Sequence, residues 1–224
     1  HFQYDQAVLS RLKEAEKLKS TSPSALYRGL FIQANSIFET YVRELSSIVA
    51  DNIASEASRY SQLPENFRHQ HIASSGRILR EINTGSLTHH KVNFDKIISA
   101  LGKCFSDAED FSLAPEVFTL IIGNITPERL DELFKKLKLE KPFEPGVGRS
   151  NTIQKVVKES RHLPAARLAK LKLEEIVRHR NVLVHGESNL AIDKSDLNET
   201  FDFLKAMIEA LGDLAGTSTI SPKQ

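Results

Sequence analysis

The sequence predicts an all-α protein, a helical bundle built around one long helix. Apolar residues recur at helical spacing through most of the 224 residues, and no alternating run of β-branched or aromatic residues competes with them. Turn-forming residues are scarce, with 10 glycines and 8 prolines, below the roughly 12% of an average chain. This composition disfavours a turn-rich sandwich or barrel, and we expect a single domain over residues 1–224.

The first two helices follow from spacing and caps. Residues 5–19 place their apolar side chains on one stripe, which predicts a surface helix. Ser22 followed by Pro23 is typical of a helix start, and the apolar spacing then continues without a breaker to about Tyr60. This helix would be about 55 Å long at 1.5 Å per residue. We expect it to be the spine against which the other helices pack.

The middle of the chain predicts shorter helices and a loop. Three segments have helical spacing, with a polar loop at 83–90 between the first two: residues 64–83, 92–105 and 115–122. Thr126 and Pro127 repeat the cap-plus-proline start of a helix. Residues 141–151 carry two prolines and two glycines, and we expect them to form a loop.

The last third predicts three helices. A short one at 152–160 precedes a stronger one from Pro164 to about Val184, which Gly186 is expected to end. Ser195 then predicts the cap of a final helix, whose buried stripe would be Leu197, Phe201, Leu204, Ile208 and Leu211. The core should extend over about residues 20–212, with residues 215–224 as a disordered tail.

Charge is distributed unevenly along a nearly neutral chain. There are 30 Lys and Arg residues against 29 Asp and Glu, a net charge of +1, which argues against binding nucleic acid by bulk charge. Residues 149–180, however, hold nine basic and three acidic side chains, a net +6, and the remainder of the chain carries −5. Such a segment indicates a local phosphate-binding surface, the alternative being a solvated helix face.

Several classes of site are disfavoured. The single cysteine, Cys104, allows neither an internal disulfide nor a cysteine-rich metal centre, and its apolar neighbours predict a core position. The pairs His69/His71 and His89/His90 lack metal-ligand spacing, so we expect solvated side chains, no metal and no cofactor. No apolar run reaches the roughly 18 residues of a membrane span. We therefore expect a cytoplasmic protein without a membrane partner.

The densest group of functional side chains is RHRNVLVHG, residues 178–186. Arg178, Asn181 and His185 fall on one stripe of a helix, whereas Arg180 and His185 are five residues and about 140° apart. Arg180 and His185 therefore converge only if the helix loosens at its end or the site is assembled between two chains.

This group of side chains suits phosphodiester cleavage without a metal. Histidine gives and takes protons near neutral pH, and arginine stabilises the growing negative charge on a phosphate. RNA supplies its own nucleophile, the 2′-hydroxyl. One His185 fills one proton-transfer role at a time, so a two-fold dimer would fill both. The alternative is structural, with the arginine paired to acids and the histidine capping the helix.

The segment IVRHRNVLVHGES resembles the signature of HEPN domains, in which an arginine, usually followed by a polar residue, precedes a histidine after four to six residues. Arg180, Asn181 and His185 stand at those positions. Two other segments, ANSIFETYVREL and GNITPERLDELFKKLKL, look like the same superfamily, particularly its branch found near ribonuclease-like and restriction-type defence systems. The resemblance covers roughly residues 20–212, and only the part around Arg180 is specific.

The resemblance implies a HEPN-like all-α homodimer with the motif at its interface, and a metal-independent endoribonuclease that leaves 2′,3′-cyclic phosphate and 5′-hydroxyl ends. Such domains often act as toxins or antiphage effectors, so a cognate antitoxin or defence-system protein is an expected partner. The alternative is a non-catalytic HEPN-like module that binds RNA, a nucleotide or a partner protein.

The same resemblance assigns roles to residues. His185 would be the acid/base residue, Arg180 would bind and stabilise the scissile phosphate, and Asn181 would have a positioning or hydrogen-bonding role. Glu39 is a candidate supporting residue, although an ordinary i, i+4 pair with Arg43 is the alternative. Further contacts with RNA are predicted for Arg178, His179 and Lys172.

Overall fold

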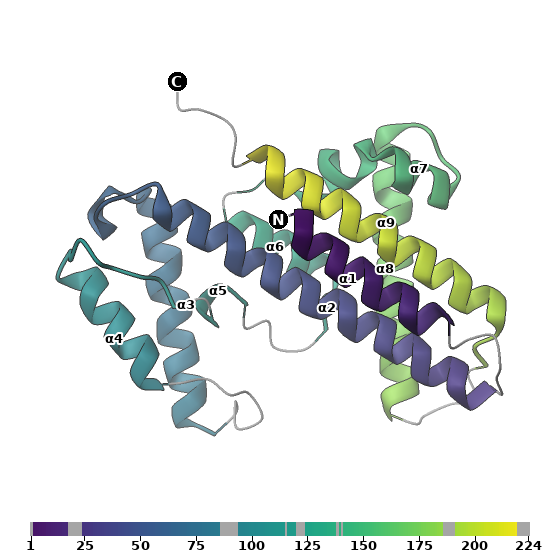
Figure 1. Ribbon diagram of the computed structural model, residues 1–224, viewed down its shortest axis with the longest axis horizontal. Helices are drawn as coiled ribbons and strands as arrows, with labels where there is room; N and C mark the ends of the chain where they lie inside the picture. The colour runs from purple at the N-terminus through teal and green to yellow at the C-terminus, as the bar shows by residue number, and fades with distance from the viewer. Residues whose placement is uncertain are drawn as a thin grey trace.

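The computed structural model describes residues 2–17, 24–85, 94–114, 116–119, 124–137, 139, 141–185 and 191–218. Within these ranges the chain forms nine α-helices and no strand (Figure 1), which confirms the predicted all-α class. None of the helices in these ranges is long and apolar enough to cross a membrane. The helices are α1 (Phe2–Lys17), α2 (Ser24–Ser55), α3 (Glu65–Asn83), α4 (Phe94–Phe105), α5 (Glu116–Thr119), α6 (Pro127–Lys136), α7 (Asn151–Val157), α8 (His162–His185) and α9 (Lys194–Ser218).

The centre of the molecule is the pairing of α2 with α9. Helix α1 lies along both, and α8 crosses α2, while α3, α4 and α5 form the opposite end (Figure 1). The Tyr41 hydroxyl of α2 donates a hydrogen bond to the Ile208 carbonyl of α9 at 3.0 Å. The predicted stripe of α9 is buried, which confirms the prediction. Phe203, Ala206 and Met207, on other sides of the same helix, are buried as well. Both α2 and α9 therefore act as the spine that was expected of α2 alone.

Some helix boundaries differ from expectation. Helix α2 ends at Ser55, and Tyr60 begins a separate helical turn, Tyr60–Gln62. The cap of α9 is Asp193 rather than Ser195, because the Asp193 carboxylate accepts hydrogen bonds from the backbone N–H groups of Ser195 at 2.7 Å and Asp196 at 2.9 Å. Helix α9 also continues through Ser218, past the start of the expected tail.

Other predictions are confirmed or fall outside the described residues. The Thr126 hydroxyl accepts a hydrogen bond from the Arg129 N–H at 3.4 Å and caps α6 as predicted. Cys104 is buried, and this burial raises the pKa of its thiol to about 11. The predictions that lie outside the described residues concern Ser22, Pro23, His89, His90, Gly186 and residues 219–224.

Residues 142–149, where a loop was expected, form two short helical turns interrupted by extended backbone at Glu144 (φ −121°, ψ 107°), and these turns pack against α8 and α9. A Cβ atom at Gly148 would lie 2.3 Å from the carbonyl oxygen of His162 and 2.8 Å from the Cβ of Ala166. The glycine that suggested a loop is therefore required for close packing against the start of α8.

Replacing Gly148 with alanine should lower the free energy of unfolding by about 2 kcal/mol, because the backbone of α8 cannot yield to the added methyl group. Denaturant unfolding measures this change. The matched control is Gly29→Ala in α2, where a Cβ would meet nothing within 4 Å. That change should instead stabilise the protein by about 0.5–1 kcal/mol. Equal effects of the two substitutions would contradict the packing described.

His71, which was expected to be solvated, is fully buried in α3. Its Nδ1 lies 3.0 Å from the Tyr60 hydroxyl oxygen, and its ring stacks on Phe118 with 5.7 Å between centroids. Its Nε2 is buried without a hydrogen-bond partner. This burial lowers the pKa of His71 to about 4. His69 is exposed, as predicted.

Acidification should therefore weaken the fold. The folded-state pKa of His71, about 4, lies below the roughly 6.5 of an unfolded chain, so the unfolded state takes up the proton first. The stabilisation is complete above about pH 6.5 and decreases by about 3 kcal/mol as the pH falls to about 4. Urea unfolding across this range tests the prediction, and His71→Leu should show a clearly smaller decrease. An identical pH dependence in both proteins would assign the effect to other groups.

Candidate functional site

The motif residues lie on the last two turns of α8, which remains helical through His185. The first part of this helix is held by small and apolar side chains that are buried: Ala165, Ala166, Ala169, Leu173, Ile176 and Val177. Asn181 is half-buried, and His185 is exposed at the last residue of the helix. The fold thus presents the end of α8 at the surface on a buried and well-packed base.

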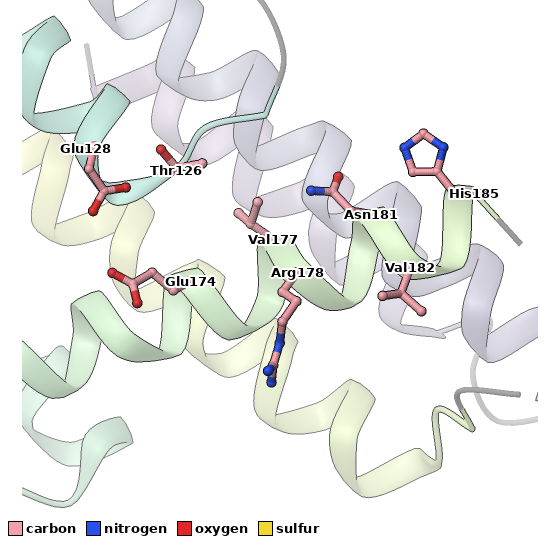
Figure 2. A pocket seen from close by; sticks show the side chains of 8 residues that line it. All are labelled: Thr126, Glu128, Glu174, Val177, Arg178, Asn181, Val182 and His185. Atoms are coloured by element: carbon pink, nitrogen blue, oxygen red, sulfur yellow. The ribbon is translucent and has the colours of Figure 1, made fainter. Parts of the chain in front are cut away.

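A pocket of about 310 Å³ opens between the outward face of this end and the start of α6. We call it the motif pocket, and its lining is Thr126, Glu128, Glu174, Val177, Arg178, Asn181, Val182 and His185. Figure 2 shows Glu128 and Glu174 at one end of the pocket, and Asn181 and His185 toward the other. The predicted stripe of Arg178, Asn181 and His185 is thus brought onto one pocket.

Asn181 is fixed by a network that the sequence did not reveal. Its side-chain oxygen accepts a hydrogen bond from the side-chain amide of Asn124, and the backbone carbonyl of Asn124 accepts one from Arg129 Nη1 at 3.1 Å. Figure 2 shows the Asn181 side chain directed toward the segment that carries Thr126. Asn124 stands 57 residues before Asn181, and no spacing pattern connects positions so far apart. Asn124 does lie in GNITPERL, the start of one of the segments that resemble HEPN domains.

Arg180 does not line the motif pocket. It lies beside Asn181, to whose side-chain oxygen its Nη1 donates at 3.4 Å. Its Nε is buried without a hydrogen-bond partner, and among the described residues it forms no ion pair. Because α8 stays regular, Arg180 and His185 remain about 140° apart around the helix axis. The helix does not loosen, so one chain does not bring these two side chains together.

The other predicted contacts lie on different surfaces. His179 is half-buried against α2, with its ring centroid 6.4 Å from that of Phe31. Lys172 pairs with Glu175 at 3.1 Å and Glu199 at 3.6 Å, beside a separate pocket of about 530 Å³ between α7, α8 and α9. Neither side chain lines the motif pocket.

Glu39 belongs to α2, where one of its carboxylate oxygens lies 3.7 Å from Arg43 Nη2. The i, i+4 pair that was the alternative is therefore present. The Glu39 side chain is 12% exposed, so it faces the interior more than an ordinary surface pair would.

The basic segment is neutralised only in part by neighbouring acids. Four of its nine cations form ion pairs with acids: Arg161, Arg167, Lys170 and Lys172. Lys170 contacts Glu128 at 3.4 Å. The pKa of Glu128 is lowered, first by its own backbone N–H, so a negative charge stays at the end of the motif pocket away from His185. Arg178 is exposed on the pocket and has no ion-pair partner in the described ranges.

The arrangement can bind an anion at one end and transfer a proton there. Arg178 provides positive charge on the motif pocket, Arg180 lies outside it beside Asn181, and an imidazole such as that of His185 can give or take a proton. Across the parts of the chain that the structure describes, no group of three or more His, Cys, Asp and Glu side chains could hold a metal ion.

Comparison with known proteins gives one result. The chain matches the model of the RiboL-PSP-HEPN family over residues 6–216. No curated protein and no solved structure gave a significant match. A match of this extent suggests a ribonuclease-like or nucleotide-binding module. With its all-α fold and its motif at the exposed end of α8, the chain belongs to the RiboL-PSP-HEPN family of HEPN domains.

Proposed function

We propose that this protein is a metal-independent endoribonuclease whose site is completed in a homodimer. The observation that carries the proposal is the placement of Asn181 and exposed His185 on one pocket, with Arg180 held beside Asn181. A histidine at the surface is available to a substrate, and the amide of Asn181 is fixed at one end by Asn124.

In this mechanism the 2′-hydroxyl of RNA attacks the adjacent phosphorus, and the bond from phosphorus to the 5′-oxygen breaks. A histidine takes the proton of the 2′-hydroxyl, and a second acid gives a proton to the leaving 5′-oxygen. Arg180 stabilises the charge that develops on the phosphate oxygens, and Asn181 positions the Arg180 guanidinium. The products are a 2′,3′-cyclic phosphate and a 5′-hydroxyl.

A second copy of the chain supplies what one chain lacks. One His185 cannot serve as base and acid in the same step, and Arg180 lies on another side of α8. The outward face of α8 also exposes Leu171 at 59%, one turn before Glu174 of the motif pocket, and an exposed apolar side chain near a site favours contact with a partner. A two-fold axis near this face would bring two copies of His185 together.

The experiment is incubation of the purified chain with structured and unstructured RNAs in EDTA. Cleavage that leaves 2′,3′-cyclic phosphate ends supports the proposal. Binding of RNA or a nucleotide without cleavage of any RNA would favour the alternative, a non-catalytic HEPN-like module. The family resemblance further supports a role as a toxin or antiphage effector restrained by a cognate partner. Expression of the native chain should then slow cell growth.

The dimer gives a separate prediction. Leu171→Glu should shift the protein to monomers and reduce RNA cleavage at least about tenfold, because two new charges would oppose each other across the two-fold axis. Light scattering measures the mass. Phe105→Glu on α4, where the ring is 67% exposed, is the matched control and should leave mass and cleavage unchanged. A native chain that is active as a monomer would exclude this arrangement.

A further inference from the structure

A second, larger cleft lies between α3 and α6. Its volume is about 680 Å³, and its lining is Asn66, His69, Gln70 and Ala73 from α3 with Glu132, Lys135 and Lys136 from α6. We call it the α3–α6 cleft. It is more than twice the volume of the motif pocket, and no residue of the HEPN signature lines it.

The two lysines of this cleft, Lys135 and Lys136, line one cavity. Among the described residues they form no ion pair, a property that they share with other lysines such as Lys155 and Lys158, whereas four lysines contact acids: Lys103, Lys170, Lys172 and Lys205. Among the described residues of the lining, Glu132 is the only acidic one. The cleft therefore carries positive charge that the described chain does not neutralise.

Lys136 is half-buried. Desolvation lowers the pKa of its ammonium group, and the charge of Arg77 acts in the same direction, while Glu132 opposes them only in part. A half-buried cation without sufficient counter-charge gains from an anion that enters the cleft. This is a property of a binding surface rather than of a solvated helix face.

The cleft and the motif pocket lie along the same helix. Glu128 lines the motif pocket and Lys135 lines the cleft, and residues seven apart on a helix share a face. These two positions are about 10 Å apart at 1.5 Å per residue, and His185 lies beyond Glu128 at the other end of the motif pocket, eleven residues and about 16 Å along α8 from Glu174. Figure 1 shows α6 between α3 and α8. A single strand bound at His185 would need several nucleotides to reach the cleft, passing Glu128, whose charge is paired with Lys170.

We propose that the α3–α6 cleft binds the backbone of single-stranded RNA that flanks the cleaved phosphodiester, with Lys135 and Lys136 contacting its phosphates. This inference rests on the proposed function. The lining favours RNA over an acidic peptide because it offers amide groups from Asn66 and Gln70, and its only apolar side chain is that of Ala73. Peptide sites normally bury larger apolar anchors.

The test uses the full chain carrying His185→Ala, so that RNA remains intact, and measures the binding of a labelled single-stranded RNA of about 12 nucleotides by fluorescence anisotropy. Adding Lys135→Gln and Lys136→Gln should weaken binding about tenfold. It should also reduce the slope of log affinity against log salt by about 1.4, at about 0.7 for each phosphate contact. The matched control is Arg11→Gln with Lys13→Gln on α1, which removes the same charge from exposed positions outside both pockets.

Equal weakening by the two double variants would overturn the proposal, because the effect would then be one of net charge. Stronger competition by a poly-glutamate peptide than by unlabelled RNA of equal charge would also overturn it, in favour of an acidic protein partner. Because these binding measurements use the His185→Ala chain, RNA cleavage does not affect them. A native chain that cuts no RNA would refute the proposed function and leave the binding result to stand by itself.

A second measurement separates the cleft from the reaction. In the chain with native His185, the lysine double variant should cut a dinucleotide, which is too short to reach the cleft, at the native rate. It should cut the 12-nucleotide RNA more slowly at concentrations below saturation, with a raised KM and an unchanged kcat. A loss of dinucleotide cleavage would show that the lysines act on the motif pocket itself and would overturn the proposal.

Discussion

Replacing His185 with alanine should reduce RNA cleavage in EDTA by about 10²- to 10⁴-fold, the usual contribution of a positioned acid or base. The side chain is exposed at the last residue of α8 and contributes nothing to the core, so the fold and the thermal midpoint should not change. The measurement is the single-turnover rate at saturating enzyme, which separates the chemical step from binding.

Val184→Ala is the matched control, because Val184 is the neighbouring residue and is 48% exposed but cannot transfer a proton. Its rate should be within about twofold of native. Mixing adds a test of the dimer. Equal amounts of native and His185→Ala chains, allowed to exchange, should retain about a quarter of the activity, since about a quarter of the dimers then hold two native subunits. Retention of one half would mean that each subunit works alone.

Replacing Arg180 with methionine should separate activity from stability. Cleavage should fall by about 10²- to 10³-fold, the typical cost of removing one group that stabilises developing charge. The free energy of unfolding should instead rise by about 1 kcal/mol, because the variant removes a buried Nε that has no acceptor. Methionine keeps the apolar stem that packs in this position. Cleavage assays and urea unfolding on the same sample give both quantities.

Arg178→Met is the control for this variant. Arg178 is exposed on the motif pocket, so its loss should weaken RNA binding but leave stability unchanged. If Arg180→Met destabilised the protein as much as it slowed cleavage, Arg180 would be a structural residue, and the assignment to the phosphate would fail.

Patterns that repeat along one helix were predicted well from the sequence. The stripe from Leu197 to Leu211 is buried as predicted, and Thr126 caps α6. Both depend on neighbours within a few residues, and the physics of spacing and capping is local at that scale. The gathering of Asn181 and His185 onto one pocket followed from the same helical spacing.

The predictions that were wrong depend on contacts between distant segments. Gly148 suggested a loop, but its lack of a side chain serves the approach of α8, which local sequence does not encode. His71 was expected in solvent, yet Tyr60 and Phe118 enclose it. The hydrogen bond from Asn124 to Asn181 joins residues 57 positions apart. Only the folded chain brings such partners together.

The two halves of α8 are held differently, and this difference governs how the protein can change over evolution. In the first half, the buried side chains are mostly alanines. Gly148 approaches the start of this half so closely that neither side has room for a larger side chain. In the second half, Arg178 and Val184 are exposed, and Val182 is only half-buried. Substitution at these three positions should cost little stability, since exposed positions rarely affect folding. The same helix therefore combines a first half in which packing permits few substitutions with a second half in which packing permits many.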